Sequence, residues 1–259
     1  MSLVTTTSAG PVLTIELNRP EARNALSLEL CDAIVVALDE AARHDEARVI
    51  VLAGAGPVFC SGADFAAVSG PKGVDFLPAF ERMLEALGDH RLPTIARIQG
   101  AALGGGLQLA TVCDFRIASS DARLGIPSSR LGVVVNLENV ERLVELVGIA
   151  RAKEVLMTGT AFSGDDALRA GLVSSVCASH ELERTAERMA LAIAALAPLS
   201  VQGAKRAIRA ITDERSVRKH NSEAALEVDA LVAEAYASGD LGEGIRAMTE
   251  KRPPDFKGS

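Results

Sequence analysis

Hydrophobic and polar residues alternate over Val12–Leu17, and the alternation stops at Asn18-Arg19-Pro20. A period of two predicts a half-buried strand, and the residues after it predict a turn. After Ser27, apolar residues recur at helical spacing, which predicts a helix that has one apolar face and Ser27 as its N-cap. The chain therefore begins with a strand followed by a helix.

Two more apolar runs, Val49–Ala53 and Thr94–Ile98, lead into glycine-rich segments. Runs of this kind predict buried strands that end in loops. Helical periodicity predicts further helices over Phe76–Leu87, Gly105–Thr111, Asn139–Val147 and Glu181–Leu196. The alternation of strands and helices predicts an α/β fold.

The region after Pro198 contains no convincing strand. Its pattern predicts helices over Leu199–Ile211, Val217–Tyr236 and Leu241–Glu250, with an apolar stripe at Leu226, Ala230, Ala233 and Ala237. An apolar helical region needs a surface to cover, either its own core or a neighbouring subunit. We therefore expect a core over residues 1–198 and a helical oligomerisation region over 199–259.

Composition narrows the class of partner. The chain has 259 residues and is 48% hydrophobic, which is enough for a buried core. A net charge of -7 disfavours nucleic acid and anionic membranes and favours a small molecule. No apolar run is long enough to span a membrane, and the N-terminus lacks the features of a signal peptide. We therefore expect a cytoplasmic protein.

Cysteine and histidine positions indicate no metal or redox site. The four cysteines are scattered without a CxxC pair, which predicts buried, reduced thiols and no metal ligands. They are Cys31, Cys60, Cys113 and Cys177. The four histidines fall in or beside predicted helices, where packing or surface roles are expected.

Two glycine-containing loops follow predicted strands, at residues 59–64 and 100–110. Ligands of α/β sheets bind at such loops. The triplet Gly104–Gly106 opens a predicted helix, where unpaired amides favour negative charge. The nucleotide fingerprints GxxxxGK[ST] and GxGxxG are absent. Two interpretations remain: a tight strand-to-helix turn, or an oxyanion hole made of two backbone amides.

These segments resemble, in order and spacing, the motifs of the enoyl-CoA hydratase/isomerase (crotonase) family. They are Asn18-Arg19-Pro20, Asn24-Ala25-Leu26, Phe59–Asp64, Gly100–Ala110 with Cys113-Asp114, Gly125-Ile126-Pro127, Leu131-Gly132, Leu156–Gly159, Ala167–Val173 and Glu250-Lys251-Arg252. The resemblance implies a spiral of ββα units with a helical C-terminal trimerisation region. It also implies a coenzyme A thioester as ligand or substrate, no covalently bound cofactor, and a homotrimer or hexamer.

The resemblance also assigns roles to residues. The backbone amides of Ala63 and Gly105 match the oxyanion hole that holds the thioester oxygen. Residues that match the coenzyme A channel or adjoin it are Arg23, Ala25, Leu26, Ser61, Ala63 and Lys251. Two of these have simpler interpretations, because Leu26 suits the core and Lys251 suits a solvated surface.

The chain departs from the family at two catalytic positions. Family hydratases use two glutamates, one for the attacking water and one for the α proton. Here Gln108 follows Gly105 at the first position, and Ser128 follows Pro127 at the second. A glutamine amide cannot act as a general acid or base near pH 7. A serine hydroxyl without a paired base is too weak a base to remove a proton. We expect hydratase activity to be lost or very weak.

Three hypotheses remain open. The first is an acyl-CoA binder or carrier in fatty-acid metabolism. The second is an active hydratase, isomerase or thioester hydrolase that uses a non-standard group such as Glu138, although its spacing from Arg142 also predicts a helical ion pair. A nucleophilic Ser61 or Cys60 is a weak variant, since the motif places no histidine beside them. The third is a trimeric scaffold that no longer binds coenzyme A.

Overall fold

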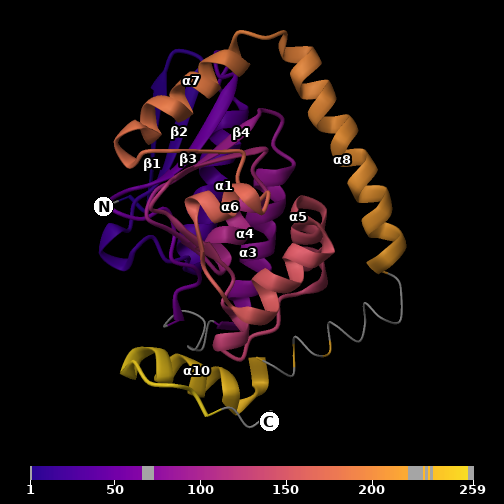
Figure 1. Cartoon of the computed structure of the whole chain (residues 1–259). Helices are drawn as coiled ribbons and strands as arrows, with labels where there is room; N and C mark the ends of the chain where they lie inside the picture. Colours follow the sequence, from indigo (N-terminus) through magenta and orange to yellow (C-terminus); the bar gives the residue numbers. More distant parts are fainter. Residues whose placement is uncertain (1, 66–72, 221–229, 231–232, 234–235, 256–259) are drawn as a thin grey trace. The chain divides into compact units, whose positions relative to one another are not determined.

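The computed structural model describes residues 2–65, 73–220, 230, 233 and 236–255 (Figure 1). The chain divides into two units. The first comprises Met1–Leu124 with Phe162–Arg209, and the second comprises Gly125–Ala161 with Ala210–Ser259. The expected boundary between residues 198 and 199 remains a prediction.

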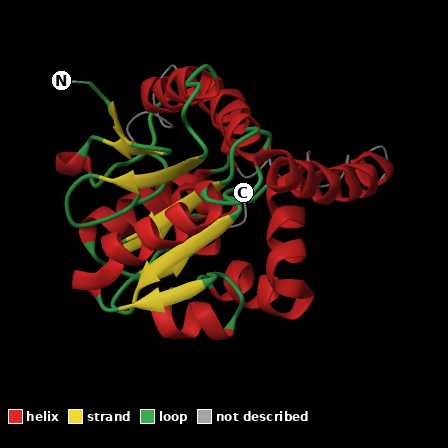
Figure 2. Cartoon of the chain, turned by 90° about the horizontal axis from the view of Figure 1, so that it is seen from above, coloured by secondary structure: helices red, strands yellow, loops and turns green. Residues whose placement is uncertain are grey.

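The main sheet has six strands in the order β1-β2-β3-β4-β6-β9 (Figures 1 and 2). The strands are β1 (Val4–Ala9), β2 (Val12–Leu17), β3 (Val49–Gly54), β4 (Thr94–Ile98), β6 (Phe115–Ser119) and β9 (Ser175–Cys177). β1 and β2 are antiparallel, and every later pair is parallel. Parallel pairing requires crossover connections, which the helices of this unit supply.

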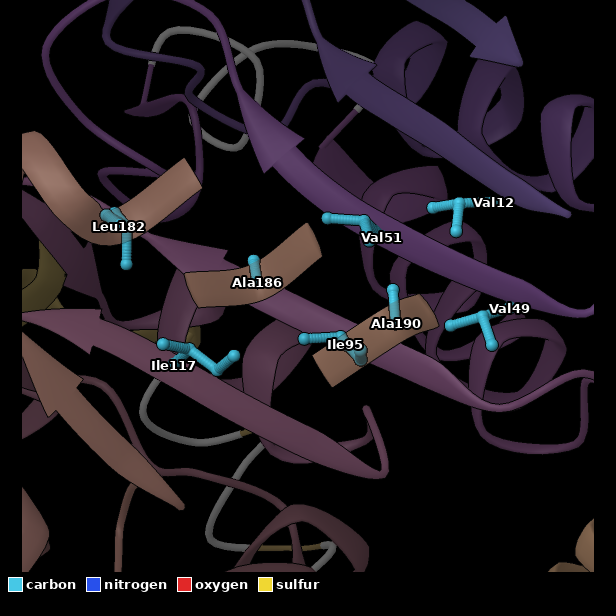
Figure 3. Close-up of a cluster of buried hydrophobic side chains, with 8 residues drawn as sticks. All are labelled: Val12, Val49, Val51, Ile95, Ile117, Leu182, Ala186 and Ala190. Carbon is cyan, nitrogen blue, oxygen red and sulfur yellow. The ribbon is translucent and has the colours of Figure 1, made fainter. Parts of the chain in front are cut away.

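Both faces of the sheet are covered. Helix α7 (Leu182–Ala194) packs on one face, where its Ala186 and Ala190 meet Val49 and Val51 of β3 (Figure 3). Ile50 points to the other face because side chains alternate along a strand, and it is also fully buried. The other helical elements described in this unit are η1 (Pro20–Ala22), α1 (Leu28–Ala42), α3 (Gly73–Gly88), α4 (Gly105–Thr111), α6 (Gly164–Arg169), η3 (Ser179–Glu181) and the first part of α8 (Pro198–His220).

A second, three-stranded sheet contains β5 (Ala101–Leu103), β7 (Arg123–Gly125) and β8 (Phe162–Ser163). One isolated parallel bridge pairs Cys60 with Ala102 of β5, and another pairs Leu26 with Ala63, so the 59–64 loop is joined both to β5 and to the segment that contains Leu26. Segments that are distant in sequence therefore meet here.

Several predicted elements are confirmed. β2, β4 and α4 have the predicted bounds, and Ser27 caps α1 by accepting a hydrogen bond from the Leu30 amide at 3.3 Å. The helix predicted over 199–211 runs further, as α8 (Pro198–His220). Most of the helix predicted over Val217–Tyr236, including Leu226, lies outside the described residues.

The second unit contains η2 (Ser128–Arg130), α5 (Leu137–Thr158) and α10 (Gly239–Glu250). A Cβ on Gly244 of α10 would lie 2.7 Å from the Cα of Leu131, so glycine lets this helix pack directly on the loop after η2. α5 is interrupted at Gly148, whose φ of 74° is not helical. None of the described helices combines the length and apolar composition of a membrane span.

Candidate functional site

Two glycine-containing loops of the first unit meet at Gly62 and Gly104. A Cβ on Gly62 would lie 2.8 Å from the carbonyl oxygen of Leu103 and 3.6 Å from the amide nitrogen of Gly105. Gly62 has φ of 107° and Gly104 has φ of 52°, values that side-chain-bearing residues rarely adopt. Glycine thus permits both the turn and the close approach.

The loop that carries Ala63 is anchored on both sides by Leu26. The Leu26 amide donates to the Gly62 carbonyl, and the Asp64 amide donates to the Leu26 carbonyl, both at 2.8 Å. Ala63 lies between these two bonds. Within the part of the chain that the structure describes, no hydrogen bond is found from the Ala63 amide, so this donor is available to a ligand.

The second loop pairs with Cys60. The Cys60 amide donates to the Ala101 carbonyl at 3.0 Å, and the Leu103 amide donates to the Cys60 carbonyl at 3.1 Å. A Cβ on Gly106 would lie 2.4 Å from that same Cys60 oxygen. The start of α4 can therefore sit against the Cys60 backbone only because residue 106 is glycine.

The first residue of α4 contributes a second available donor. The amides of Leu107 and Gln108 both donate to the Gly104 carbonyl at 3.1 Å. For the Gly105 amide, no hydrogen bond is found among residues 2–65, 73–220 and the described part of the C-terminal region. The amides of Ala63 and Gly105 thus belong to adjoining loops.

The surroundings of Gly105 are apolar. A Cβ on Gly105 would lie 3.3 Å from both Leu26 Cδ1 and Phe80 Cε2. Leu26 is fully buried, as its core interpretation predicts, and Phe80 stacks on Phe76 with ring centroids 5.7 Å apart. Apolar walls lower the local dielectric constant, which strengthens any hydrogen bond from these amides.

Gln108 lies one turn beyond Gly105 on α4. Residues three apart in a helix share a face, so the Gln108 side chain is on the Gly105 side of α4. This side chain is half-buried. No hydrogen bond is found for its amide among the described residues, although it can both donate and accept.

Hydrogen bonds tie residues 18–26, which include the predicted coenzyme A contacts Arg23, Ala25 and Leu26, to the Ala63 loop. The Arg19 guanidinium donates to the Ala25 carbonyl at 2.7 Å and to the Asp64 carboxylate at 3.0 Å. The Ser61 amide donates to the Arg23 carbonyl at 3.1 Å. The predicted residues Arg23, Ala25, Leu26, Ser61 and Ala63 are therefore brought together in one unit.

The buried Asn24 side chain stabilises the same segment, a role that the sequence pattern did not predict. Its side-chain nitrogen donates to the carbonyls of Ala55, Val58 and Phe59 at 2.9, 2.9 and 3.1 Å. Its side-chain oxygen accepts from the Arg19 amide at 2.9 Å. Asn24 is fully buried and has φ of 54°, a conformation that asparagine tolerates better than most residues.

Three of the four cysteine thiols are poor nucleophiles. Burial raises the pKa of Cys31, Cys60 and Cys113 to about 12, so their reactive thiolate forms are scarce at neutral pH. Cys60 is fully buried beside the Ala63 loop. Cys177, in the short strand β9, is only half-buried, so the prediction of four buried thiols holds for three.

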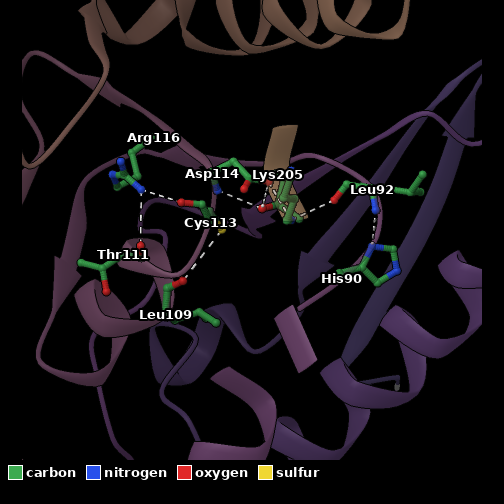
Figure 4. A network of polar contacts seen from close by, with 9 residues as sticks. His90, Leu92, Leu109, Thr111, Cys113, Asp114, Arg116 and Lys205 are labelled. Carbon is green, nitrogen blue, oxygen red and sulfur yellow. Dashed lines mark hydrogen bonds and ion pairs between the residues drawn. The ribbon is translucent and has the colours of Figure 1, made fainter. Parts of the chain in front are cut away.

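Asp114 has a strand-end role. Its carboxylate accepts hydrogen bonds from the Thr94 amide at 2.7 Å, the Thr94 hydroxyl at 3.0 Å and the Lys205 ammonium at 2.8 Å (Figure 4). These bonds join β4, the loop after α4, and α8. Asp114 therefore has a structural, hydrogen-bonding role at the start of β6.

The second unit contains the remaining predicted site residues, Ser128, Glu138 and Lys251. Ser128 begins η2, and Asn136 caps α5 through a hydrogen bond from the Asn139 amide at 3.1 Å. Glu138 forms an ion pair with Arg142, as its i,i+4 spacing predicts. Their side chains are 34% and 14% exposed, so the carboxylate has a neutralising partner close at hand.

Lys251 lies at the end of α10. It adopts a left-handed conformation with φ of 55°, and its side chain is exposed. The next residue, Arg252, donates two hydrogen bonds to Glu243 and lowers the pKa of that carboxyl to about 2. These bonds from Arg252 hold the chain that follows α10 against Glu243. The contact of Lys251 with coenzyme A remains a prediction.

Comparison with known proteins adds relatives along the whole chain. A model of the enoyl-CoA hydratase/isomerase family matches residues 7–259. A probable enoyl-CoA hydratase of Mycobacterium leprae is 38% identical over 260 residues, which cover 98% of each chain. A probable enoyl-CoA hydratase of Bacillus subtilis is 36% identical over 252 residues and 95% of each chain.

Solved structures give the same result. An enoyl-CoA hydratase/isomerase from Pseudoalteromonas atlantica is similar with a TM-score of 0.87 and 30% identity, covering 98% of this chain and 100% of that one. A methylmalonyl-CoA decarboxylase in complex with 2-nitronate-propionyl-CoA is similar with a TM-score of 0.89 and 26% identity, covering 99% of both chains. The chain has the crotonase fold and belongs to the enoyl-CoA hydratase/isomerase family.

Proposed function

We propose that this protein binds acyl-CoA thioesters, with the amides of Ala63 and Gly105 donating hydrogen bonds to the thioester oxygen. The observation that carries the proposal is the presence of two available amides on adjoining, glycine-shaped loops. Two such donors polarise the carbonyl and stabilise an enolate, and one of them can contribute about 3 kcal/mol. Arg23, Ala25, Ser61 and Lys251 would contact the coenzyme A portion.

The second part of the proposal is that hydration is lost or very weak. Gln108 and Ser128 would stand where family hydratases have their two glutamates. Hydration must deprotonate water and protonate the α carbon, and each positioned acid or base contributes roughly 100-fold or more. A half-buried amide and an unassisted hydroxyl supply neither step.

An active enzyme that uses Glu138 is the alternative. Its carboxylate is paired with Arg142 on the same helix, which favours a structural ion pair.

The names of relatives place them among enzymes of CoA esters, and this supports a role for this chain in acyl-CoA metabolism, including that of fatty acids. For such a role we propose a homotrimer or a hexamer, which light scattering would distinguish from a monomer.

Calorimetry tests the binding proposal. The ligands would be octanoyl-CoA, free CoA, and the octyl thioether analogue that lacks the carbonyl. Because two neutral hydrogen bonds contribute about 1–3 kcal/mol together, we expect octanoyl-CoA to bind roughly tenfold tighter than the thioether. Equal affinity for all three ligands would contradict the proposed role of the two amides.

Loss of absorbance from crotonyl-CoA tests the loss of hydration. We expect binding without turnover, and partial recovery of hydration when Gln108→Glu is combined with Ser128→Glu. The single variant Glu138→Gln is the control for the alternative. Robust wild-type hydration that Glu138→Gln abolishes would establish the alternative instead.

A further inference from the structure

Strand β1 (Val4–Ala9) is an edge of the six-stranded sheet, with β2 as its neighbour (Figure 1). In an antiparallel ladder, residues that bond to the neighbouring strand alternate with residues whose backbone groups point the other way. The Asn18 amide donates to the Leu3 carbonyl at 2.8 Å, which fixes this alternation along β1. The backbone groups that point away from β2 therefore belong to every second residue of the strand, namely Val4, Thr6 and Ser8.

The outward backbone groups of β1 are available to another strand. For the three outward amides, no acceptor is found within the part of the chain that the structure describes. The Val4 carbonyl accepts a hydrogen bond from the Ser2 hydroxyl at 2.6 Å, and its second lone pair can accept another. Thr6 and Ser8 are exposed. A row of such donors and acceptors is a template for pairing with a further strand.

β1 lacks the features with which proteins usually protect an edge strand. Charged residues make up 24% of the chain, yet the first charged side chain is that of Glu16, so β1 carries none. The register with β2 runs without interruption from Val4 to Ala9, which excludes a bulge, and β1 contains no proline. Charges, bulges and prolines are the usual means of preventing edge-to-edge association. The edge of β1 is therefore suited to be covered by another strand.

We propose that β1 pairs with β1 of a second copy of this chain, antiparallel and around a two-fold axis at Thr6. The three outward residues lie symmetrically about Thr6 in the strand. The axis therefore brings Thr6 opposite Thr6 of the partner subunit, and Val4 opposite Ser8 of the partner subunit. Each of these pairs exchanges two N–H···O hydrogen bonds, so every outward amide of both strands gains an acceptor.

Charge and composition favour a second copy as the partner. Each copy has a net charge of -7, so two copies repel each other least where the facing surfaces are uncharged. A two-fold axis also opposes residues of the same strand to each other, and the sequence Val-Thr-Thr-Thr-Ser-Ala contains no charge that would meet its like. Threonine pairs on neighbouring strands are favourable, and β-branched residues suit strands.

One pair of β1 strands is a small contact compared with the roughly 1,000 Å² that a stable interface buries. Several such contacts acting together are much stronger than one, because the later ones form within an assembly that is already joined. In this respect the inference rests on the proposed homotrimer, in which each copy would offer one β1 edge. Two trimers joined through these edges would form the proposed hexamer.

The experiment measures the mass of the assembly by light scattering after size-exclusion chromatography, for the wild type, Thr6→Lys and Thr6→Glu. Each variant places two like charges opposite each other on the axis, which destabilises the strand pair. We expect a hexamer for the wild type and a trimer for each variant. An equal mixture of the two variants should regain the wild-type mass, because lysine then faces glutamate. This recovery would also show that both variants are folded.

Ala192→Lys and Ala192→Glu are the matched controls, because Ala192 is exposed on α7 and lies outside β1. Both should keep the wild-type mass. Hydrogen exchange of residues 2–9 gives an independent measurement, and these amides should exchange at least about tenfold faster in Thr6→Lys than in the wild type.

The outcomes separate this inference from the proposed trimer. A wild-type trimer whose mass is the same in both Thr6 variants would overturn the pairing of β1 and leave the trimer standing. A wild-type dimer that Thr6→Lys splits into monomers would support the pairing and contradict the trimer. Failure of the mixed variants to regain the wild-type mass would overturn the two-fold axis at Thr6.

Discussion

Arg19 donates a hydrogen bond to the carboxylate of Asp64 at 3.0 Å. Asp64 directly follows Ala63, whose amide is proposed to bind the thioester oxygen. The two side chains are 18% and 22% exposed, so the pair is largely shielded from water. The same guanidinium also binds the Ala25 carbonyl. One side chain therefore fixes two segments of the site relative to each other.

A double-mutant cycle with Arg19→Met and Asp64→Asn should give a coupling energy of about 1–2 kcal/mol in urea denaturation. Arg19→Lys should recover little of it, because a single ammonium does not reproduce the planar fork of the guanidinium. The exposed pair Arg82–Asp32 is the control, with side chains 54% and 50% exposed and an expected coupling below about 0.5 kcal/mol. Equal coupling in both pairs would contradict the structural importance of Arg19.

Asn24→Asp should lower the free energy of unfolding by about 3 kcal/mol or more. The substitution keeps the shape of the side chain but replaces a donor to three carbonyls with a buried, negatively charged oxygen. Backbone strain would not explain the loss, because aspartate also tolerates the left-handed conformation. Denaturant titration near pH 7 measures the change.

Asn18→Asp is the matched control for Asn24. The Asn18 side chain donates to a single carbonyl, that of Ser2, in an exposed position. We expect a change below about 1 kcal/mol. Similar losses in the two variants would mean that the four hydrogen bonds of Asn24 contribute little to stability.

Gly106→Ala should displace α4 from the Cys60 loop. The new Cβ would lie 2.4 Å from a backbone oxygen, which cannot move away as a flexible side chain could. We expect a loss of about 2–3 kcal/mol in stability and weaker acyl-CoA binding. Gly203→Ala is the control, since nothing lies within 4 Å of its Cβ in helix α8, and there we expect a gain of roughly 0.5–1 kcal/mol.

The predicted elements with strong local signals match the structure closely. β2 alternates clearly, β4 is a short apolar run, and α4 opens at a glycine triplet; turn residues or glycines also lie at their borders, so their bounds could be predicted. β7 and β9 have only three residues each, too few for a period to appear, and their pairing depends on strands far away in sequence. The tertiary partners, not the local pattern, determine such strands.

The candidate site could be predicted only in part, because some of its residues have local sequence signals and others depend on distant partners. The loops at residues 59–64 and 100–110 could be recognised from their glycine content and their position after predicted strands. Asn24 and Arg19 act through carbonyls and a carboxylate that lie up to 45 positions away, and no local pattern in the sequence identifies those acceptors. Their place in the family motif was visible, whereas their hydrogen bonds required the structure.

His90 should make the protein less stable as the pH falls from 7 to 5. The ring is buried, with Nε2 3.2 Å from the Leu38 carbonyl oxygen and Nδ1 accepting from the Leu92 amide at 3.1 Å (Figure 4). Since Nδ1 accepts, the neutral ring carries its proton on Nε2 and can donate it to Leu38. Protonation of Nδ1 would break the bond from the Leu92 amide.

Burial, with the nearby cations Lys205 and Arg91, lowers the pKa of His90 below its usual value of about 6.5. In the unfolded chain the ring binds a proton near pH 6.5, while in the folded chain it binds one only at lower pH. The unfolded state thus holds more protons between these two values, so stability is complete above about pH 6.5 and declines below it. The slope is at most about 1.4 kcal/mol per pH unit.

Denaturant titrations at several pH values from 5 to 8 measure this slope. His90→Gln keeps one donor and one acceptor but does not titrate, so its stability should be lower at pH 7 and should decline less between pH 7 and 5. His180→Gln is the control, because His180 is exposed and its replacement should leave the slope as it is in the wild type. A slope that is unchanged in His90→Gln would assign the pH dependence to other groups and refute the role given to the buried ring.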